Sequence, residues 1–254
     1  MKKWVYKTLL TICAIVALIG CVVMGTGLKS KYDKYSLEQT KLQNKATIEM
    51  VQDATVFLMG QNEKYEVTGT GTGFVIKSDE QGSWIITNKH ICTMSRYSTK
   101  EYNDNGGLFT FRPLVALSRH GRPQGVLVVK VAQNADLCLL RTEEKFKKPL
   151  KLAAKVKSKE KMFTFGFPGG KPELNFGIYK GTEGNPNGFY SATDLKIWYG
   201  ASGSAVVNMN GEVIGVISNI RFLEDIPRKK QTREKVFESL FIPLEILREF
   251  IGGL

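Results

Sequence analysis

Histidine and cysteine are scarce in this sequence, and their scarcity limits the chemistry that it can support. Only two histidines occur, His90 and His120. None of the four cysteines belongs to a Cys-x-x-Cys pair, so we predict no zinc site and no other cofactor. Internal repeats and low-complexity tracts are also lacking in the sequence. Any reaction that needs an imidazole base therefore has only two candidates.

An excess of acidic residues is lacking too, because the formal net charge is +12. Residues 1–45 hold eight lysines and two acids, which gives +6, and residues 141–161 hold nine basic and three acidic residues, which gives another +6. No basic stripe is interleaved with stacking aromatic residues, so we do not expect nucleic-acid binding. We interpret the lysine-rich segment 141–161 as a solvated linker.

The N-terminal region combines basic residues with a long uncharged run. The segment from Thr8 to Leu28 carries no charge over 21 residues, and at about 1.5 Å per residue a helix of this length crosses a bilayer core. We therefore predict a short cytoplasmic N-terminus (1–7), a single-pass transmembrane signal anchor (8–28), a polar stalk (29–48) and an extracytoplasmic body (49–254). Secretion after cleavage near residues 25–27, or lipidation of Cys21 in a lipobox-like "LIGC", are the alternatives.

Short hydrophobic runs dominate the body. Runs such as "ATVFLMG", "GSWIITN", "ADLCLLR", "MFTFGFP" and "GEVIGVIS" are rich in β-branched and aromatic residues and are separated by Gly, Asn, Pro and Asp. This pattern predicts an all-β barrel or sandwich. The final run "PLEILREFI" has apolar residues at positions 244, 247, 250 and 251, which predicts an amphipathic helix.

Ser202 lies in "YGASGSAVV", between small residues that permit a tight turn. A serine nucleophile needs a neighbouring base, usually histidine, and a carboxylate that orients the base. His90 directly follows an apolar strand, whereas His120 lies in a polar, turn-like stretch, so we favour His90. Asp136 precedes the apolar run "LCLL" and is favoured as the carboxylate over three aspartates in polar surroundings, Asp79, Asp104 and Asp194.

Taken together, the motifs "GTGTGFVI", "WIITNKHIC", "NADLCLL", "FGFPGG" and "GASGSAVVNMNGEVIGVIS" resemble the trypsin-like serine proteases, most closely their HtrA/Deg branch, over about residues 50–254. The resemblance implies two six-stranded antiparallel β-barrels with a C-terminal helix, and protein or peptide substrates. It also implies that His90 is the general base, Asp136 its orienting acid and Ser202 the nucleophile. The backbone N–H groups of Gly200 and Ser202 would form the oxyanion hole.

Some positions depart from the family pattern. Ala201 replaces the aspartate that pairs with a freed N-terminus in digestive relatives, so we expect no activation of that kind. Ser204 and Ala205 replace a usual Gly and Pro, but both are small enough for the turn. No PDZ-like domain is expected after residue 254.

The cysteines also differ from the digestive pattern. Cys92 comes two residues after His90 rather than one, so the usual disulfide of those relatives is not indicated. We expect Cys92 and Cys138 to be buried thiols that act as small hydrophobic residues. A disulfide between them is the alternative, because both flank the candidate catalytic residues.

Three residues are candidates for substrate binding. The resemblance puts Lys196 near the floor of the primary specificity pocket, where it would favour an acidic side chain. Ser218 would begin the strand that pairs with the substrate backbone, and Ile220 on that strand would narrow the pocket toward small aliphatic side chains.

We also consider two functions without catalysis. The first is a protease-like module that binds a peptide or protein without cutting it, which would require a blocked cleft, for example by the basic segment 223–235. The second is an electrostatic adaptor that binds anionic membranes through the lysine-rich segments.

Overall fold

A computed structural model describes residues 44–62, 64–93, 99–102, 108–111, 114–118, 123–185, 188–222, 227–252 and 254. Within these ranges, no helix is both long enough and apolar enough to span a membrane. The predicted segments 1–7 and 8–28 and most of the stalk lie outside the described residues, as do His120 and Asp104. The described chain begins with a helical segment at residues 44–53 that leads into the first strand.

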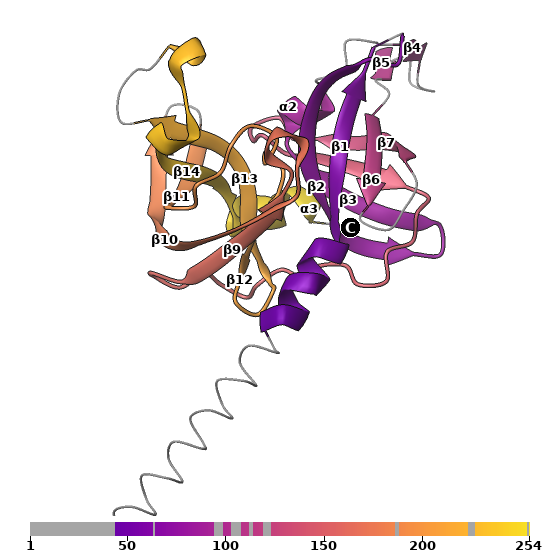
Figure 1. Cartoon of the computed structure of the whole chain (residues 1–254). Coiled ribbons are helices and arrows are strands. Elements are labelled where there is room, and N and C mark those ends of the chain that lie inside the picture. Colours follow the sequence, from indigo (N-terminus) through magenta and orange to yellow (C-terminus); the bar gives the residue numbers. More distant parts are fainter. Residues whose placement is uncertain are drawn as a thin grey trace, which may run out of the picture. The chain divides into compact units, whose positions relative to one another are not determined.

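The first barrel is antiparallel and closed, because its first strand pairs with both the second and the last strand in the spatial order. Figure 1 shows it with the indigo to magenta strands. In spatial order the strands are β1 (Thr55–Gln61), β2 (Val67–Asp79), β3 (Gly82–Thr87), β8 (Cys138–Thr142), β7 (Gln124–Val131) and β6 (Leu114–Ser118). A separate hairpin joins β4 (Thr99–Tyr102) to β5 (Leu108–Phe111).

The second barrel is also antiparallel and closed, and it contains the orange and yellow strands of Figure 1. Its strands in spatial order are β10 (Glu173–Asn185), β11 (Gly188–Thr193), β14 (Val236–Pro243), β13 (Val213–Phe222), β12 (Ala205–Asn208) and β9 (Lys161–Gly166). Short 3-10 turns lie at η1 (Pro168–Gly170), η2 (Arg228–Lys230) and η3 (Arg233–Lys235).

Apolar side chains that alternate along the strands fill each barrel, and other apolar side chains pack between the two barrels. On β1, for example, Val56 and Leu58 point into the first barrel, as the two-residue period of a strand requires. A further apolar cluster contains residues of both barrels: Phe74 and Leu137 come from the first half of the body, and Phe163 and Val207 come from the second half. This shared apolar cluster holds the two barrels against each other, and so fixes the cleft between them.

The chain ends in helix α3 (Leu244–Ile251), whose Leu244, Leu247 and Phe250 are buried. Lys130 of β7 donates a hydrogen bond of 2.6 Å to the Phe250 carbonyl, which ties this helix to the first barrel. The prediction of two six-stranded antiparallel barrels followed by an amphipathic helix is therefore confirmed.

Candidate active site

His90 is placed by the short helix α2 (Lys89–Cys92), which begins directly after β3. Asn88, the residue before the helix, donates from its side-chain amide to the Asp136 carbonyl at 2.9 Å. Lys89 donates to the Ala132 carbonyl at 3.1 Å. Both bonds link the start of α2 to the loop before β8, so that loop and the helix hold one position relative to each other.

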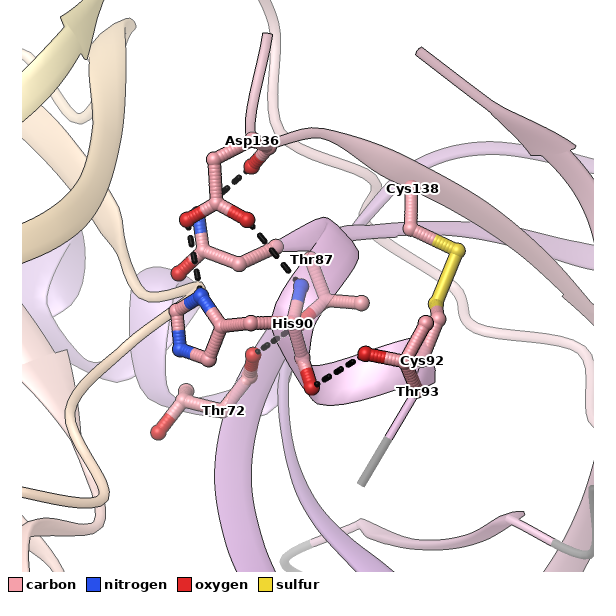
Figure 2. Close-up of a disulfide and its surroundings, with 8 residues drawn as sticks. Thr72, Thr87, His90, Cys92, Thr93, Asp136 and Cys138 are labelled. Carbon is pink, nitrogen blue, oxygen red and sulfur yellow. Dashed lines mark hydrogen bonds and ion pairs between the residues drawn. A yellow bond between two sulfur atoms is a disulfide. The ribbon is translucent and has the colours of Figure 1, made fainter. Parts of the chain in front are cut away.

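Asp136 accepts hydrogen bonds from His90 through both of its carboxylate oxygens. His90 Nδ1 lies 2.7 Å from Asp136 Oδ2, and the His90 backbone N–H donates to Oδ1 at 3.0 Å (Figure 2). Ser218 on β13 donates its hydroxyl to Oδ2 at 2.7 Å. Burial raises the pKa of the Asp136 carboxyl, but the hydrogen bonds and charge of His90 outweigh burial, so this pKa lies below its ordinary value.

Ser202 occupies a tight turn between β11 and β12 whose two glycines have left-handed backbone angles. Gly200 has φ +99° and Gly203 has φ +87°, and a Cβ at either position would collide with backbone of a neighbouring segment. Ser204 closes the turn, because its N–H and its hydroxyl both donate to the Ala201 carbonyl. The predicted tolerance of the turn for Ser204 is therefore confirmed, and glycine is required at 200 and 203.

A cavity of about 710 Å³ brings the candidate catalytic residues onto one surface. His90, Asp136, Ser202 and Ser218 all line it. A second, adjoining hollow is lined by His90, Ser202 and Gly200. The Ser202 hydroxyl is 3.5 Å from the Ser218 carbonyl, so the side chain lies within this cleft.

The other aspartates have different partners. Asp79 binds the Arg141 guanidinium, which holds the pKa of its carboxyl far below the usual range. Asp194 accepts a hydrogen bond from the Ile178 N–H at 2.6 Å. Among the described aspartates considered above, Asp136 alone contacts His90.

Residues 71–216, more than half of the chain, match the model of the trypsin-like peptidase domain. The chain belongs to this family. The resemblance stated from the sequence is therefore confirmed.

Solved structures support the same fold for this trypsin-like peptidase domain. A serine endoprotease from Yersinia pestis is 18% identical, with 81% of this chain and 64% of that chain covered and a TM-score of 0.60. The active form of the Rv3671c protease from M. tuberculosis is 18% identical, with 84% and 87% covered and a TM-score of 0.59. The chain thus spans just under two thirds of the Yersinia protein.

The expectation of two free thiols in the peptidase domain was wrong. Cys92 and Cys138 form a disulfide with a Cα–Cα distance of 6.5 Å (Figure 2). The cause is the strand register, since Cys138 pairs with Thr87 at the end of β3 and α2 then folds Cys92 back over β8. The bridge therefore joins the two segments that carry His90 and Asp136.

Two of the three substrate-binding candidates line the cavity, and the third does not. Ser218 and Ile220 line the cavity of the peptidase domain, together with Ile197 and Tyr190. Lys196 instead directs its ammonium group to the Val236 carbonyl, at 2.6 Å. Lys196 is not among the residues that line this cavity, because its side chain binds the backbone at the start of β14, and its role in substrate binding stays a prediction.

The basic segment proposed to block the cleft is described from residue 227 onward. Gln231 lines the cavity and accepts a hydrogen bond of 2.6 Å from the Tyr199 hydroxyl. Arg233 binds both the Glu173 carboxylate and the Lys196 carbonyl. The hydrogen bond from Arg233 lowers the pKa of Glu173. Gln231 of this segment therefore forms part of the cavity wall, and Arg233 anchors the segment beside it.

Several site residues escaped the sequence analysis. Asn88 and the contact between Ser218 and Asp136 could not be found from spacing, because they depend on which loops meet. Thr72 is the most connected of them: it contacts Gly200, Ser202 and Phe167 by hydrogen bonds. Its only sequence signal is its place in the glycine-rich motif "GTGTGF", whose glycines let β2 approach other segments closely.

Proposed function

We propose that the chain is a membrane-tethered or exported serine endopeptidase that uses Ser202, His90 and Asp136 as a catalytic triad. One observation carries the proposal: Asp136 accepts from both Nδ1 and the backbone N–H of His90, in a cavity that Ser202 also lines. A carboxylate held in this way fixes the ring so that its other nitrogen, Nε2, is free to act as a base.

The reaction follows from these roles. Nε2 of His90 takes the proton of the Ser202 hydroxyl while Oγ bonds to the substrate carbonyl carbon, and the carbonyl electrons move to its oxygen. When this tetrahedral intermediate collapses, the peptide C–N bond breaks and His90 gives the proton to the leaving amine. The acyl-enzyme is then hydrolysed by a water molecule that His90 deprotonates.

The backbone around Gly200 suits an oxyanion hole. The Tyr199 carbonyl accepts a hydrogen bond from the Gly169 N–H at 2.8 Å. Because no peptide bond of the described chain is cis, the N–H of Gly200 points away from that carbonyl. Gly200 also lines the hollow shared by His90 and Ser202. This geometry supports the assignment of the Gly200 N–H as one donor to the developing oxyanion, and we propose the Ser202 N–H as the second.

Apolar residues around the cavity support a preference for a small aliphatic side chain before the scissile bond. Ile220 and Ile197 line the cavity, and the ammonium group of Lys196 is bound to the Val236 carbonyl. We therefore expect peptide libraries to show cleavage after Ala, Val or similar residues. A marked preference for Arg, Lys, Asp or Glu at this position would contradict the assignment.

The tethering proposal rests on the uncharged segment from Thr8 to Leu28. The disulfide between Cys92 and Cys138 gives independent support for export, since structural disulfides form and persist in oxidising compartments. Cleavage of the segment or lipidation at Cys21 would also place the body outside the cytoplasm.

A membrane-impermeant fluorophosphonate probe tests the activity and the topology together. We expect it to label the full chain on intact spheroplasts, because the phosphonate reacts with an activated serine that faces the outside. The Ser202→Ala variant should remain unlabelled. Ser78→Ala is the serine control that keeps labelling, because Ser78 contacts Ser83 in the first barrel and does not line the cavity. Labelling of wild type only after permeabilisation would contradict export, and equal labelling of Ser202→Ala would contradict the nucleophile.

The alternative of a binding module without catalysis is favoured only by the wall that Gln231 and Tyr199 form across part of the cavity. If that wall keeps substrates from Ser202, the purified wild-type chain will bind peptides but show neither labelling nor hydrolysis. This result would replace the endopeptidase proposal by the binding one.

A further inference from the structure

We propose that Thr72 is a positioning residue that holds the oxyanion hole in its competent form. The inference rests on the proposed function and adds a residue from the first barrel to a site whose nucleophile belongs to the second. Thr72 lies on β2 and is fully buried. It reaches the Ser202 turn across the junction of the two barrels.

Four hydrogen bonds surround Thr72. Its hydroxyl donates to the Gly200 carbonyl at 2.9 Å and accepts from the Phe167 N–H at 3.1 Å. Its backbone N–H donates to the Ser202 carbonyl at 2.8 Å. Its own carbonyl accepts from the Thr87 hydroxyl at 2.7 Å, a contact drawn in Figure 2. Thr72 therefore bonds to the residues on both sides of Ala201 and to the strand that leads to His90.

The direction of the hydroxyl bond is unambiguous. A carbonyl can only accept and a backbone N–H can only donate, so the single hydroxyl proton of Thr72 must point at Gly200. The lone pairs of the same oxygen face Phe167. One hydroxyl thus fixes two segments at once, namely the Ser202 turn and the "FPGG" loop.

Gly200 is the residue most in need of such support. Glycine populates positive and negative φ about equally, so the peptides on either side of it can rotate at little steric cost. The peptide before Gly200 is held by the Gly169 N–H at the Tyr199 carbonyl, and the peptide after it is held by Thr72. With both carbonyls bound, the N–H of Gly200 keeps the direction that the oxyanion requires.

The test is a Thr72→Val variant, which keeps the shape of the side chain but removes the hydroxyl. We expect kcat/KM to fall about 10- to 100-fold, somewhat less than the loss of an oxyanion donor itself, with KM changed less than about twofold. Thr72→Ser should restore most of the activity, because it returns the hydroxyl without the methyl group. Steady-state kinetics on a peptide substrate measures these values.

A second readout separates positioning from a general loss of stability. A peptide boronic acid forms a tetrahedral adduct with a serine and places an oxygen in the oxyanion hole, whereas a product peptide does not. We expect Thr72→Val to lower the affinity for the boronic acid by the same factor as kcat/KM and to leave the affinity for the product peptide unchanged. Thr55→Val is the matched control, since Thr55 is equally buried and donates to the Val51 carbonyl, away from Gly200.

The outcomes separate cleanly. Unchanged kcat/KM and boronic acid affinity in Thr72→Val would overturn the role of Thr72, and so would an equal loss in Thr55→Val or in Thr72→Ser. If Thr72→Val does not fold, the same comparison between Thr72→Ser and Thr72→Ala decides the question. A wild-type chain that neither hydrolyses peptides nor reacts with fluorophosphonate would instead contradict the proposed function.

Discussion

Replacing Asp136 with asparagine is expected to lower kcat/KM about 10⁴-fold, the loss seen when the orienting carboxylate of a serine protease triad becomes an amide. Oδ2 of Asp136 accepts from His90 Nδ1, and Oδ1 accepts from the His90 backbone N–H. In asparagine one of these oxygens becomes an NH₂ group, which cannot accept. The backbone N–H cannot change its role, so the amide NH₂ will face the ring and donate to Nδ1. The ring then carries its proton on Nε2 and cannot take the Ser202 proton.

The lowered pKa of Asp136 also predicts how stability depends on pH. Because the folded-state pKa lies below the ordinary value of about 3.9, the charged carboxylate stabilises the wild type above that pH, and this contribution is lost as the pH falls through the lowered pKa. The unfolding free energy of the wild type should therefore fall relative to that of Asp136→Asn below about pH 4. Urea unfolding of both proteins from about pH 5 to about pH 2 measures this, and a constant difference over that range would contradict the lowered pKa.

Asp194→Asn is the matched control for the activity measurement on Asp136→Asn. Asp194 accepts from the Ile178 N–H in the second barrel and does not line the cavity of the candidate site. Its replacement should lower the free energy of unfolding but leave kcat/KM within about twofold of the wild-type value. A comparable loss of activity in both variants would show that the Asp136→Asn effect comes from damage to the fold rather than from the His90 tautomer.

Local patterns in the sequence predicted much of the fold. Runs such as "GSWIITN" and "GEVIGVIS" form strands because they combine β-branched residues with glycine or asparagine at the ends, and both properties act within a few residues. Strand β10 was missed because its sequence is rich in glycine and charge, and its Phe176 and Ile178 are exposed. It forms nevertheless, because β9 and β11 pair with it on both sides.

Within the candidate site, the sequence predicted the residues that lie beside a recognisable element. His90 follows a strand and Asp136 precedes one, and the structure brings them into contact. Thr72 and the position of Lys196 could not be predicted, because both depend on contacts between segments more than 30 residues apart. The disulfide was only the alternative expectation for the same reason: the pairing of β3 with β8 decides whether its cysteines meet.

Removal of the disulfide between Cys92 and Cys138 should lower the free energy of unfolding strongly. Cys92 and Cys138 are 46 residues apart in the sequence. A cross-link over a loop of that length lowers the entropy of the unfolded chain, so that its loss is expected to cost about 4 kcal/mol of unfolding free energy. Because folded domains are stable by only about 5–15 kcal/mol, the Cys92→Ser/Cys138→Ser variant should unfold at much lower urea concentration than the wild type.

The measurement is urea unfolding of the full chain in a Cys13→Ser/Cys21→Ser background, in which Cys92 and Cys138 are the only cysteines left. Cys92→Ser, Cys138→Ser and the double variant should lose nearly the same free energy, since either change breaks the same bond. Additive losses would instead indicate that each sulfur contributes mainly by packing, and a double variant within about 1 kcal/mol of its parent would contradict the cross-link argument. Because both sulfurs are buried, a reductant should produce this destabilised state only when urea opens the barrel, and not under native conditions.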